Sequence, residues 1–547
     1  MLRYFFITVT AFCIPFASHA DEALRARVEA LAVEPRVAGV AVADPEFLIR
    51  FYERRQFSPA WESEAKRAAL LDALSRSDAH GLDPADYHID LLNEHRGRRE
   101  PGQSEPGQSE QSSAVFELLA SDALARYAFH VRFGKVNPEA LESSWNFSRT
   151  LQGASPITVF QGLVEAGDIA AAVDALAPQE PRYAQRQEAL RAYRDLQRAG
   201  GWPQLADGRL RLGMHGAAVA SLRDRLRIER HLDTVAGDDP ELFDEPLEAA
   251  VRSFQRLRGL DADGVVGPQT LAALNVPVEA RIGQLRVNLE RLRWIFRDLE
   301  ERYIVANIAR YQVTLVEHGE PVWSTRAVVG TPYRQTPSFR AQMTYLVLNP
   351  TWTVPPGILR NDLLPELRRS PETLARRNMV VLDTHGRTVD PAAVDWHAAH
   401  FPYMLRQQPG PDNALGRIKF MLPNSHHVYM HETPSREFFG RADRTFSSGC
   451  IRLEQPLELA ELLLAETGRW DRAALDAALA HGEPRTVTLP RPLTVLLIYA
   501  TAVPQDGELL LLPDVYRRDG GVLQALDAPF EFVPPVGYED ALASNVP

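Results

Sequence analysis

The chain has little cysteine, no excess of basic charge and no long apolar run beyond its first residues. Only 2 of its 547 residues are cysteines, which excludes a small secreted scaffold held by several disulfide bridges. With 72 acidic residues against 60 basic ones, the formal charge of -12 disfavours general binding to a phosphate backbone. After residue 20 the most apolar stretch, residues 493–503, has only the length of a strand, so no membrane helix of about 20 apolar residues is expected.

The size and composition predict several globular units. Hydrophobic residues make up 45% of the chain, which is ordinary for folded domains and excludes a disordered or collagen-like protein. At roughly 150 residues per domain, the length predicts three or four units, each able to bury a core.

Residues 1–20 have the pattern of a secretory signal peptide. Arg3 precedes an apolar run over residues 4–16, which is too short to span a bilayer, and small residues lead to Ala20. We expect cleavage after Ala20, a soluble mature protein outside the cytoplasm, and no lipid anchor. Cleavage would remove Cys13 and leave Cys450 as the single thiol. A lone thiol in an exported protein is inert and buried, intermolecular, or reactive.

The first half of the mature chain is helical in pattern. Apolar residues at helical spacing predict a scaffold domain over residues 21–200, with a flexible insertion at 100–113, where a Pro-, Gly-, Ser- and Gln-rich unit is repeated once. Residues 201–279 predict a compact three-helix domain. Its first two helices show apolar faces over 219–226 and 247–257, and a glycine-containing turn precedes a short third helix.

The apolar period changes from helical to alternating near residue 302. A connecting helix is expected over 280–301 and a β-rich, sandwich-like domain over 302–505, including two strands that meet at His318–Gly319. Residues 357–411 are helical and loop-like, which predicts a capping subdomain, and residues 506–547 form a C-terminal extension. The expected fold class is therefore multi-domain α+β.

Residues 420–456 carry the candidate chemistry. His431 lies 19 positions before Cys450, and a polar, glycine-containing loop separates them. A free cysteine is mostly protonated at neutral pH, so a nearby histidine activates it as a base or as the cation of an ion pair. The two residues together predict a minimal nucleophilic site.

The flanking residues predict further parts of an acyl-transfer site. In the sequence SSGC, the backbone amides of Ser448, Gly449 and Cys450 are expected to converge on an oxyanion. Tyr429 lies two residues before His431 on the same strand face and offers a hydroxyl donor. Arg452 is placed to pair with a substrate carboxylate or with a neighbouring acidic side chain.

A zinc site is the competing interpretation. His426, His427, His431 and Cys450 are suitable ligands, but the sequence has neither a second nearby cysteine nor an HExxH helix. We therefore expect no metal.

The strings HETPSREFFGRADRTFSSGCIRL, VVGTPYRQTPSF and LNPTWTVPP resemble the L,D-transpeptidases, with their YkuD-type catalytic domain. The strings LRLGMHGAAVASLRDRL and FQRLRGLDADGVVGPQT resemble the small peptidoglycan-binding domain that accompanies many cell-wall enzymes. For this second domain, the alternative is a three-helix spacer that no longer binds peptidoglycan. Together the resemblances are closest to the large periplasmic members of Gram-negative bacteria.

This resemblance implies roles for individual residues. Cys450 is the nucleophile, His431 its base, and Ser448, Gly449 and Cys450 form the oxyanion turn. Tyr429 adds a stabilising hydroxyl, Arg452 matches the arginine of the motif, and Trp352 lines the donor site. Many members have histidine where this chain has Ser448, so no role of that histidine is carried over.

The resemblance implies a periplasmic enzyme that needs no cofactor and is acylated by carbapenem-type β-lactams. The expected reaction joins two peptidoglycan stems through diaminopimelate, releasing D-alanine by way of a thioester. One alternative is L,D-carboxypeptidase, endopeptidase or D-amino-acid exchange activity at the same site. A further alternative is a non-catalytic adaptor that binds the cell wall. The expected partners are the stem peptides and glycan of peptidoglycan and other cell-wall synthases, but no nucleic acid.

Overall fold

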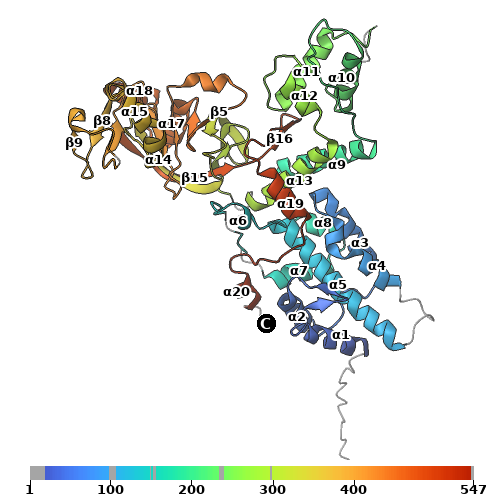
Figure 1. Cartoon of the computed structure of the whole chain (residues 1–547). Coiled ribbons are helices and arrows are strands. Elements are labelled where there is room, and N and C mark those ends of the chain that lie inside the picture. Colours follow the sequence, from blue (N-terminus) through green and yellow to red (C-terminus); the bar gives the residue numbers. More distant parts are fainter. Residues whose placement is uncertain are drawn as a thin grey trace, which may run out of the picture. The chain divides into compact units, whose positions relative to one another are not determined.

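The computed structural model describes residues 19–97, 106–147, 149–151, 155–232, 239–295, 299–398 and 400–543. The chain divides into two compact units (Figure 1). Unit 1 comprises residues 1–136, 148–179 and 525–547, and unit 2 comprises residues 137–147 and 180–524. The predicted signal peptide lies outside the described residues, except for its last two positions. No helix in the described ranges combines the length and apolar character needed to cross a bilayer.

Unit 1 is helical and is organised around the long helix α5. Its helices are α1 (His19–Ala30), α2 (Pro45–Arg54), α3 (Glu64–Ser75), α4 (Ile89–Gly97), α5 (Pro106–Phe133), α7 (Pro156–Glu165), α8 (Ile169–Asp174) and α20 (Tyr538–Ala543). The predicted flexible insertion, residues 100–113, falls on residues 100–105, outside the described ranges, and on the first turns of α5. Buried polar groups of α5 fix neighbouring segments, since Ser121 accepts the indole N–H of Trp61 at 3.0 Å.

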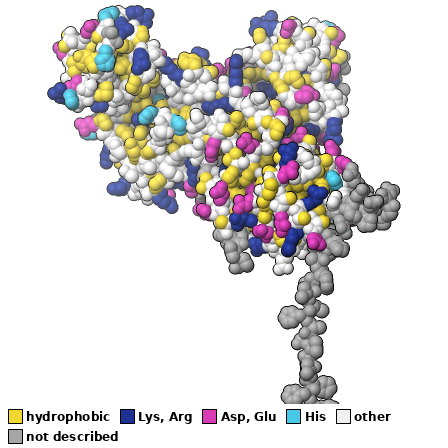
Figure 2. Space-filling view, turned by 60° about the horizontal axis from the view of Figure 1, so that its bottom comes forward, with side chains coloured by type: hydrophobic (Ala, Val, Ile, Leu, Met, Phe, Trp, Pro, Cys, Tyr) yellow, Lys and Arg dark blue, Asp and Glu magenta, His cyan; other side chains and the backbone are white. Residues whose placement is uncertain are grey.

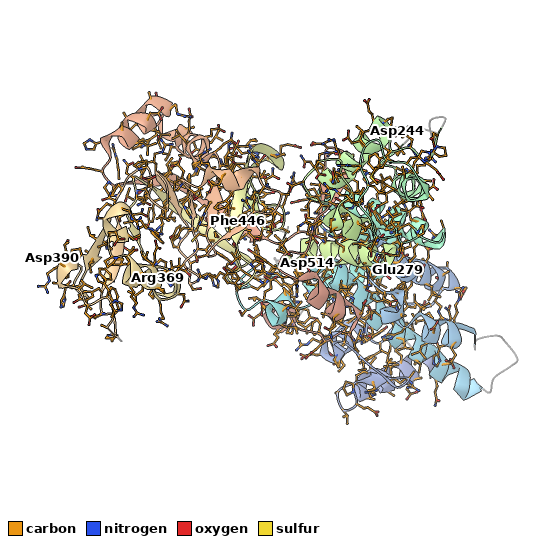
Figure 3. The ribbon with its side chains drawn as sticks, turned by 45° about the horizontal axis from the view of Figure 1, so that its top comes forward. Asp244, Glu279, Arg369, Asp390, Phe446 and Asp514 are labelled. Carbon is orange, nitrogen blue, oxygen red and sulfur yellow. The ribbon has the colours of Figure 1, made fainter. Side chains whose placement is uncertain are left out.

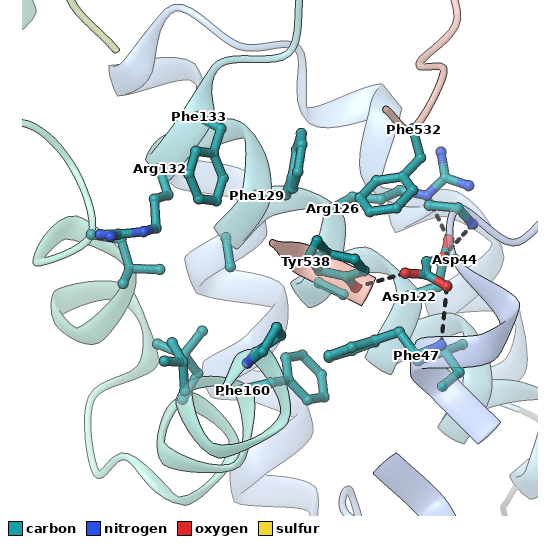
Figure 4. A pocket seen from close by; sticks show the side chains of 18 of the residues that line it. Asp44, Phe47, Asp122, Arg126, Phe129, Arg132, Phe133, Phe160, Phe532 and Tyr538 are labelled. Atoms are coloured by element: carbon teal, nitrogen blue, oxygen red, sulfur yellow. Dashed lines mark hydrogen bonds and ion pairs between the residues drawn. The ribbon is translucent and has the colours of Figure 1, made fainter. Parts of the chain in front are cut away.

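The C-terminal segment of the chain completes unit 1. Phe530 and Phe532 contact Phe129 of α5, with ring centroids 5.7 and 5.1 Å apart, and the Tyr538 hydroxyl donates to Asp44 at 2.6 Å. These aromatic residues border an apolar cavity of about 210 Å³ (Figure 4). The segment therefore forms part of the core of a domain that begins some 500 residues earlier.

Unit 2 contains the expected three-helix domain. The apolar faces of α10 (Ala217–Ile228), α11 (Glu245–Leu257) and α12 (Pro268–Leu274) share one buried core that includes Val219, Leu222, Phe254 and Leu274. Asp244 caps α11 by accepting the amide of Leu247, and its position is labelled in Figure 3. Helix α9 (Pro181–Arg198) precedes this domain and α13 (Val278–Ile295) follows it.

The β-rich domain is built on one large sheet. Its strands are β3 (Arg302–Asn307), β4 (Gln312–Glu317), β5 (Glu320–Gly330), β6 (Phe339–Leu348), β11 (Ile418–Met421), β12 (Met430–His431), β13 (Thr445–Ser447), β14 (Ile451–Leu453) and β15 (Arg485–Ile498). The order is β13-β5-β14-β12-β11-β6-β15-β3-β4, and β4 also pairs with β5, which closes the sheet on itself. Helices α17 (Pro456–Leu464) and α18 (Arg472–His481) contribute to its core.

The predicted hairpin at His318–Gly319 joins β4 and β5. Both residues have positive φ, 50° and 84°, as a two-residue hairpin turn requires. Figure 2 shows acidic and basic side chains mixed over the visible face.

The capping subdomain contains the expected short helices, α14 (Pro356–Ile358), α15 (Leu364–Arg369) and α16 (Thr373–Arg376). It also contains a small sheet that the sequence did not reveal, in the order β7 (Trp352–Thr353), β10 (Met404–Gln407), β8 (Met379–Leu382) and β9 (Thr388–Val389). These strands are two to four residues long, too short for a clear alternation of apolar residues. They surround a separate apolar core that includes Leu367, Val381 and Leu405.

The last elements of unit 2 follow β15. Strands β16 (Ala502–Gln505) and β17 (Glu508–Leu511) form a hairpin, and α19 (Asp519–Asp527) comes next. Helix α6 (Pro138–Leu141) also belongs to unit 2.

Candidate active site

Three neighbouring strands bring the candidate residues onto one face of the sheet. Lys419 of β11 is paired with His431 of β12, which is paired with Arg452 of β14. Side chains alternate along a strand, so Tyr429 and Cys450, each two residues away, lie on this same face. The intervening Phe420, Met430 and Ile451 point into the buried core. The alternation thus separates a polar face from the core.

His431 is held as a neutral base. It is only 4% exposed, its Nδ1 donates to the Glu432 carbonyl at 2.5 Å, and the Leu415 carbonyl is a second backbone partner of the imidazole. Burial, followed by the charge of Arg452 and then that of Lys419, lowers the pKa of His431 to about 3. The imidazole therefore stays unprotonated at neutral pH.

Cys450 stands directly before β14 and is half-buried. Its thiol donates to the His427 carbonyl, with Sγ and O 3.9 Å apart. The Tyr429 hydroxyl acts on the pKa of the thiol, and Trp352 acts on the pKa of that hydroxyl, each as a hydrogen-bonding neighbour. Burial raises the pKa of Cys450, whereas the hydrogen bonds from Tyr429 and the charges of Lys419 and Arg452 act in the opposite direction. The structure thus joins Cys450, Tyr429 and Trp352 in one chain of contacts.

The turn before Cys450 depends on one glycine. Gly449 has φ 115°, which side-chain-bearing residues rarely adopt. Its amide donates to Ser447 Oγ at 3.1 Å, and Ser447 Oγ donates to the Cys450 carbonyl at 2.6 Å. Of the three amides expected to converge on an oxyanion, that of Gly449 is thus already engaged. The amides of Ser448 and Cys450 have no partner among the described residues.

Ser448 is exposed and connects the turn to the capping subdomain. Arg334, after β5, donates to Ser448 Oγ at 3.0 Å and makes a bidentate ion pair with Asp362, at 2.6 and 3.0 Å. Figure 3 labels Phe446, which precedes the turn on β13.

Lys419 is the site residue that the sequence analysis missed. Its Nζ lies 3.9 Å from the centroid of the Tyr429 ring, a cation–π distance. Lysine is rare in this chain, and Lys419 is the only one between residues 301 and 479. The scarcity of lysine in this part of the sequence is the signal that could have identified Lys419 as a site residue.

Two further features concern ligands. In the described part of the chain, no group of three or more His, Cys, Asp or Glu residues is placed to hold a metal ion. A groove of about 660 Å³ reaches Ser448 and Gly449 and is also lined by His426, Arg517 and Arg518. This volume is large enough for a peptide-sized ligand.

Comparison with known families assigns the domains. Residues 301–479 match the L,D-transpeptidase catalytic domain, residues 215–274 a "Putative peptidoglycan binding domain", and residues 46–190 a scaffold domain. The chain therefore carries a YkuD-type L,D-transpeptidase catalytic domain, which is an enzyme domain, together with a peptidoglycan-binding domain. The resemblance inferred from the motifs and the α+β class are confirmed.

Individual relatives match parts of the chain. A "Putative L,D-transpeptidase" of Haemophilus influenzae is 36% identical over 244 residues, 44% of this chain and 49% of the relative. The N-acetylmuramoyl-L-alanine amidase CwlM of Mycobacterium tuberculosis is 42% identical over 80 residues, 13% of this chain and 20% of its own. The chain thus matches about half the length of the first relative. The match to a solved L,D-transpeptidase of Xylanimonas cellulosilytica covers 54% of this chain and 98% of that chain. The sequences are 16% identical and the TM-score is 0.15, which is too low to compare the two folds.

Proposed function

We propose that the protein is a periplasmic peptidoglycan L,D-transpeptidase that uses Cys450 as its nucleophile. The observation that supports this most directly is the placement of Cys450, Tyr429 and His431 on one face of the sheet inside a matched L,D-transpeptidase domain. The donor is a tetrapeptide stem, and the acceptor is the amine of a second stem.

In the first step, His431 Nε2 takes the thiol proton and the Cys450 sulfur attacks the carbonyl of diaminopimelate. The carbon–sulfur bond forms, the bond to the terminal D-alanine nitrogen breaks, and His431 returns the proton to the leaving amine. In the second step, the acceptor amine forms an amide with the same carbon and the carbon–sulfur bond breaks. The proton lost by the amine restores the thiol through His431.

The charges around His431 favour a neutral thiol–imidazole pair in the resting enzyme. Two cations on adjacent strands oppose protonation of His431, and burial opposes ionisation of Cys450. This argues against a standing ion pair in the resting enzyme; the same shift makes His431 a weak base, so we propose that the thiol proton moves to it as the sulfur attacks.

The amide of Cys450 and the hydroxyl of Tyr429 are the proposed donors to the oxyanion, with the Ser448 amide as a third. Gly449 acts through its backbone conformation, because its own amide is bonded to Ser447. Trp352, hydrogen-bonded to Tyr429, lines the donor side.

The groove beside Ser448 and Gly449 has room for a peptide stem, which transpeptidation, hydrolysis and D-amino-acid exchange all require, so the choice of acceptor is left to the product analysis. The three-helix domain is proposed to hold the enzyme on peptidoglycan and so raise the local concentration of stems. Carbapenem-type β-lactams are proposed to acylate Cys450.

Residues 21–547 and the Cys450→Ala variant, incubated with disaccharide-tetrapeptide, test the proposal by mass spectrometry of the products. We expect a dimer that has lost one D-alanine from the parent protein and none from Cys450→Ala. Tripeptide without dimer would indicate the hydrolytic alternative. Equal product from both proteins, or none from either, would contradict a cysteine transpeptidase, provided that circular dichroism shows both to be folded.

A further inference from the structure

Lys419 and Arg452 place two positive charges beside His431, and no acidic side chain within the described ranges acts on Lys419. Neither cation forms an ion pair with an acidic side chain of the described residues, and the buried Nε of Arg452 has no hydrogen-bond partner. The charge of Glu437 acts on Arg452, whereas Glu432, next to His431 in sequence, is bound by the amide and the guanidinium of Arg417. Lys419 is therefore the unbalanced charge of this polar face.

The choice of lysine at this position is unusual for the chain. Only three of its 60 basic residues are lysines, Lys66, Lys135 and Lys419. An ammonium is a compact charge with three donors that can turn toward a ligand, whereas a guanidinium is a rigid planar fork. The Lys419 ammonium rests on the Tyr429 ring, and a cation–π contact leaves its donors available to a ligand.

A half-buried cation without a counter-ion is costly, and such charges concentrate at functional sites. We propose that Lys419, assisted by Arg452, binds the free α-carboxylate of the residue that leaves the donor stem. The substrate then supplies the missing counter-ion. This inference rests on the proposed transpeptidase function and adds a specificity residue to it.

The position of the ammonium fits this assignment. Lys419 Nζ lies 3.9 Å from the centroid of the Tyr429 ring, on the face that also carries Cys450. The carboxylate of the next residue lies roughly 3.8 Å beyond the attacked carbonyl, and an ammonium–carboxylate hydrogen bond adds about 2.8 Å, so an ammonium within about 6.6 Å of that carbonyl reaches the carboxylate.

The consequence is selection of the cleavage position. A carboxylate at this distance exists only when a single residue follows the attacked carbonyl. Lys419 therefore favours stems that end one residue after the scissile bond and disfavours longer stems, whose next carbonyl is a neutral amide.

Two matched donors test the assignment: a disaccharide-tetrapeptide with a free C-terminal carboxylate, and the same molecule with a C-terminal carboxamide. Release of the terminal residue is measured for the parent protein, Lys419→Met, Lys419→Arg and Lys66→Met, the last being the same substitution on the scaffold helix α3. The parent protein should prefer the carboxylate donor. Lys419→Met should lose about tenfold to a hundredfold on that donor, the range for a hydrogen bond to a charged group, and change by less than threefold on the carboxamide.

Lys419→Arg should recover part of the preference, and Lys66→Met should behave as the parent protein does. Each result is the ratio of the release rates measured with the two donors. A change in Cys450 reactivity affects both rates equally and therefore cancels. An equal loss on both donors in Lys419→Met, or no preference in the parent protein, would overturn the inference and leave the proposed function intact. No turnover of either donor by the parent protein would overturn both. If Lys419→Met fails to fold, the preference of the parent protein still decides.

Discussion

Single residues decide the protonation state of this site. His431 lies between Lys419 and Arg452 in one cross-strand row, so its imidazole cannot gain a proton without facing two like charges. Because the pKa of His431 is lowered to about 3, the base form is present across the whole neutral range. Burial raises the pKa of Cys450, so the thiol is the group whose ionisation changes in the alkaline range.

Tyr429 sets the reactivity of Cys450. Its hydroxyl donates a hydrogen bond that favours the thiolate and lowers the pKa of Cys450. In Tyr429→Phe that bond is lost, so the pKa should rise by about half a unit to one unit. The pH profile of Cys450 alkylation by iodoacetamide measures this, and its midpoint should move to higher pH, with slower reaction at pH 7.

Tyr333→Phe is the matched control, because Tyr333 is 81% exposed and distant from the thiol in sequence. Its profile should overlay that of the parent protein. A midpoint of Tyr429→Phe that stays in place, or moves to lower pH, would show that the hydroxyl does not stabilise the thiolate.

At the scale of elements, Arg334 connects the capping subdomain to the catalytic turn. It pairs with Asp362 between α14 and α15 and donates to Ser448, the residue two positions before Cys450. The pair is partly exposed, and such ion pairs contribute about 0–1 kcal/mol to stability. The Arg334–Asp362 pair should therefore affect the geometry of the catalytic turn rather than the free energy of unfolding.

We expect Arg334→Gln to reduce turnover of a tetrapeptide donor by about fivefold to tenfold, while the melting temperature changes by no more than about 2 °C. Steady-state assays and thermal melts measure the two effects. Arg377→Gln breaks a similar bidentate pair, with Glu366, inside the capping subdomain and should leave turnover unchanged. Equal turnover by the two variants would remove the proposed role of Arg334.

At the scale of the whole molecule, the first and the last described segments of the chain belong to one domain. The C-terminal residues Phe530, Phe532 and Tyr538 complete the aromatic packing on α5 and contact Asp44, whereas the transpeptidase domain lies in unit 2. The scaffold fold therefore depends on residues that follow the catalytic domain in sequence.

Deletion of residues 528–547, which leaves α19 whole, should destabilise unit 1 selectively. Loss of the three aromatic side chains exposes apolar surface of α5, so calorimetry should show the unit 1 transition lowered by at least about 5 °C. The unit 2 transition and the alkylation rate of Cys450 should remain as in the full chain. The double variant Phe530→Ala/Phe532→Ala should show a smaller shift of the same transition. A uniform fall of both transitions would contradict the division into two units.

The sequence was informative wherever a residue pattern is local. The helical spacing in the three-helix domain, the hairpin at His318–Gly319 and the motif around His431 and Cys450 depend on neighbours a few positions apart, so they are readable from one chain. The short sheet of the capping subdomain was not readable. Its strand β10 pairs with residues 22 to 55 positions earlier in the chain, and all four strands are too brief to show a period.

Tertiary structure decided the features that depend on pairing between distant strands. The cross-strand register brings Lys419 beside His431, a lysine that no motif marks, and the same register holds Arg452 on the other side. The sequence SSGC predicted that the Gly449 amide would bind an oxyanion, but in the structure this amide is hydrogen-bonded to Ser447. The sequence by itself determined which chemical groups are present and which domain carries them. Only the folded sheet determined which charges surround the thiol, because electrostatic interactions depend on distances in space rather than along the chain.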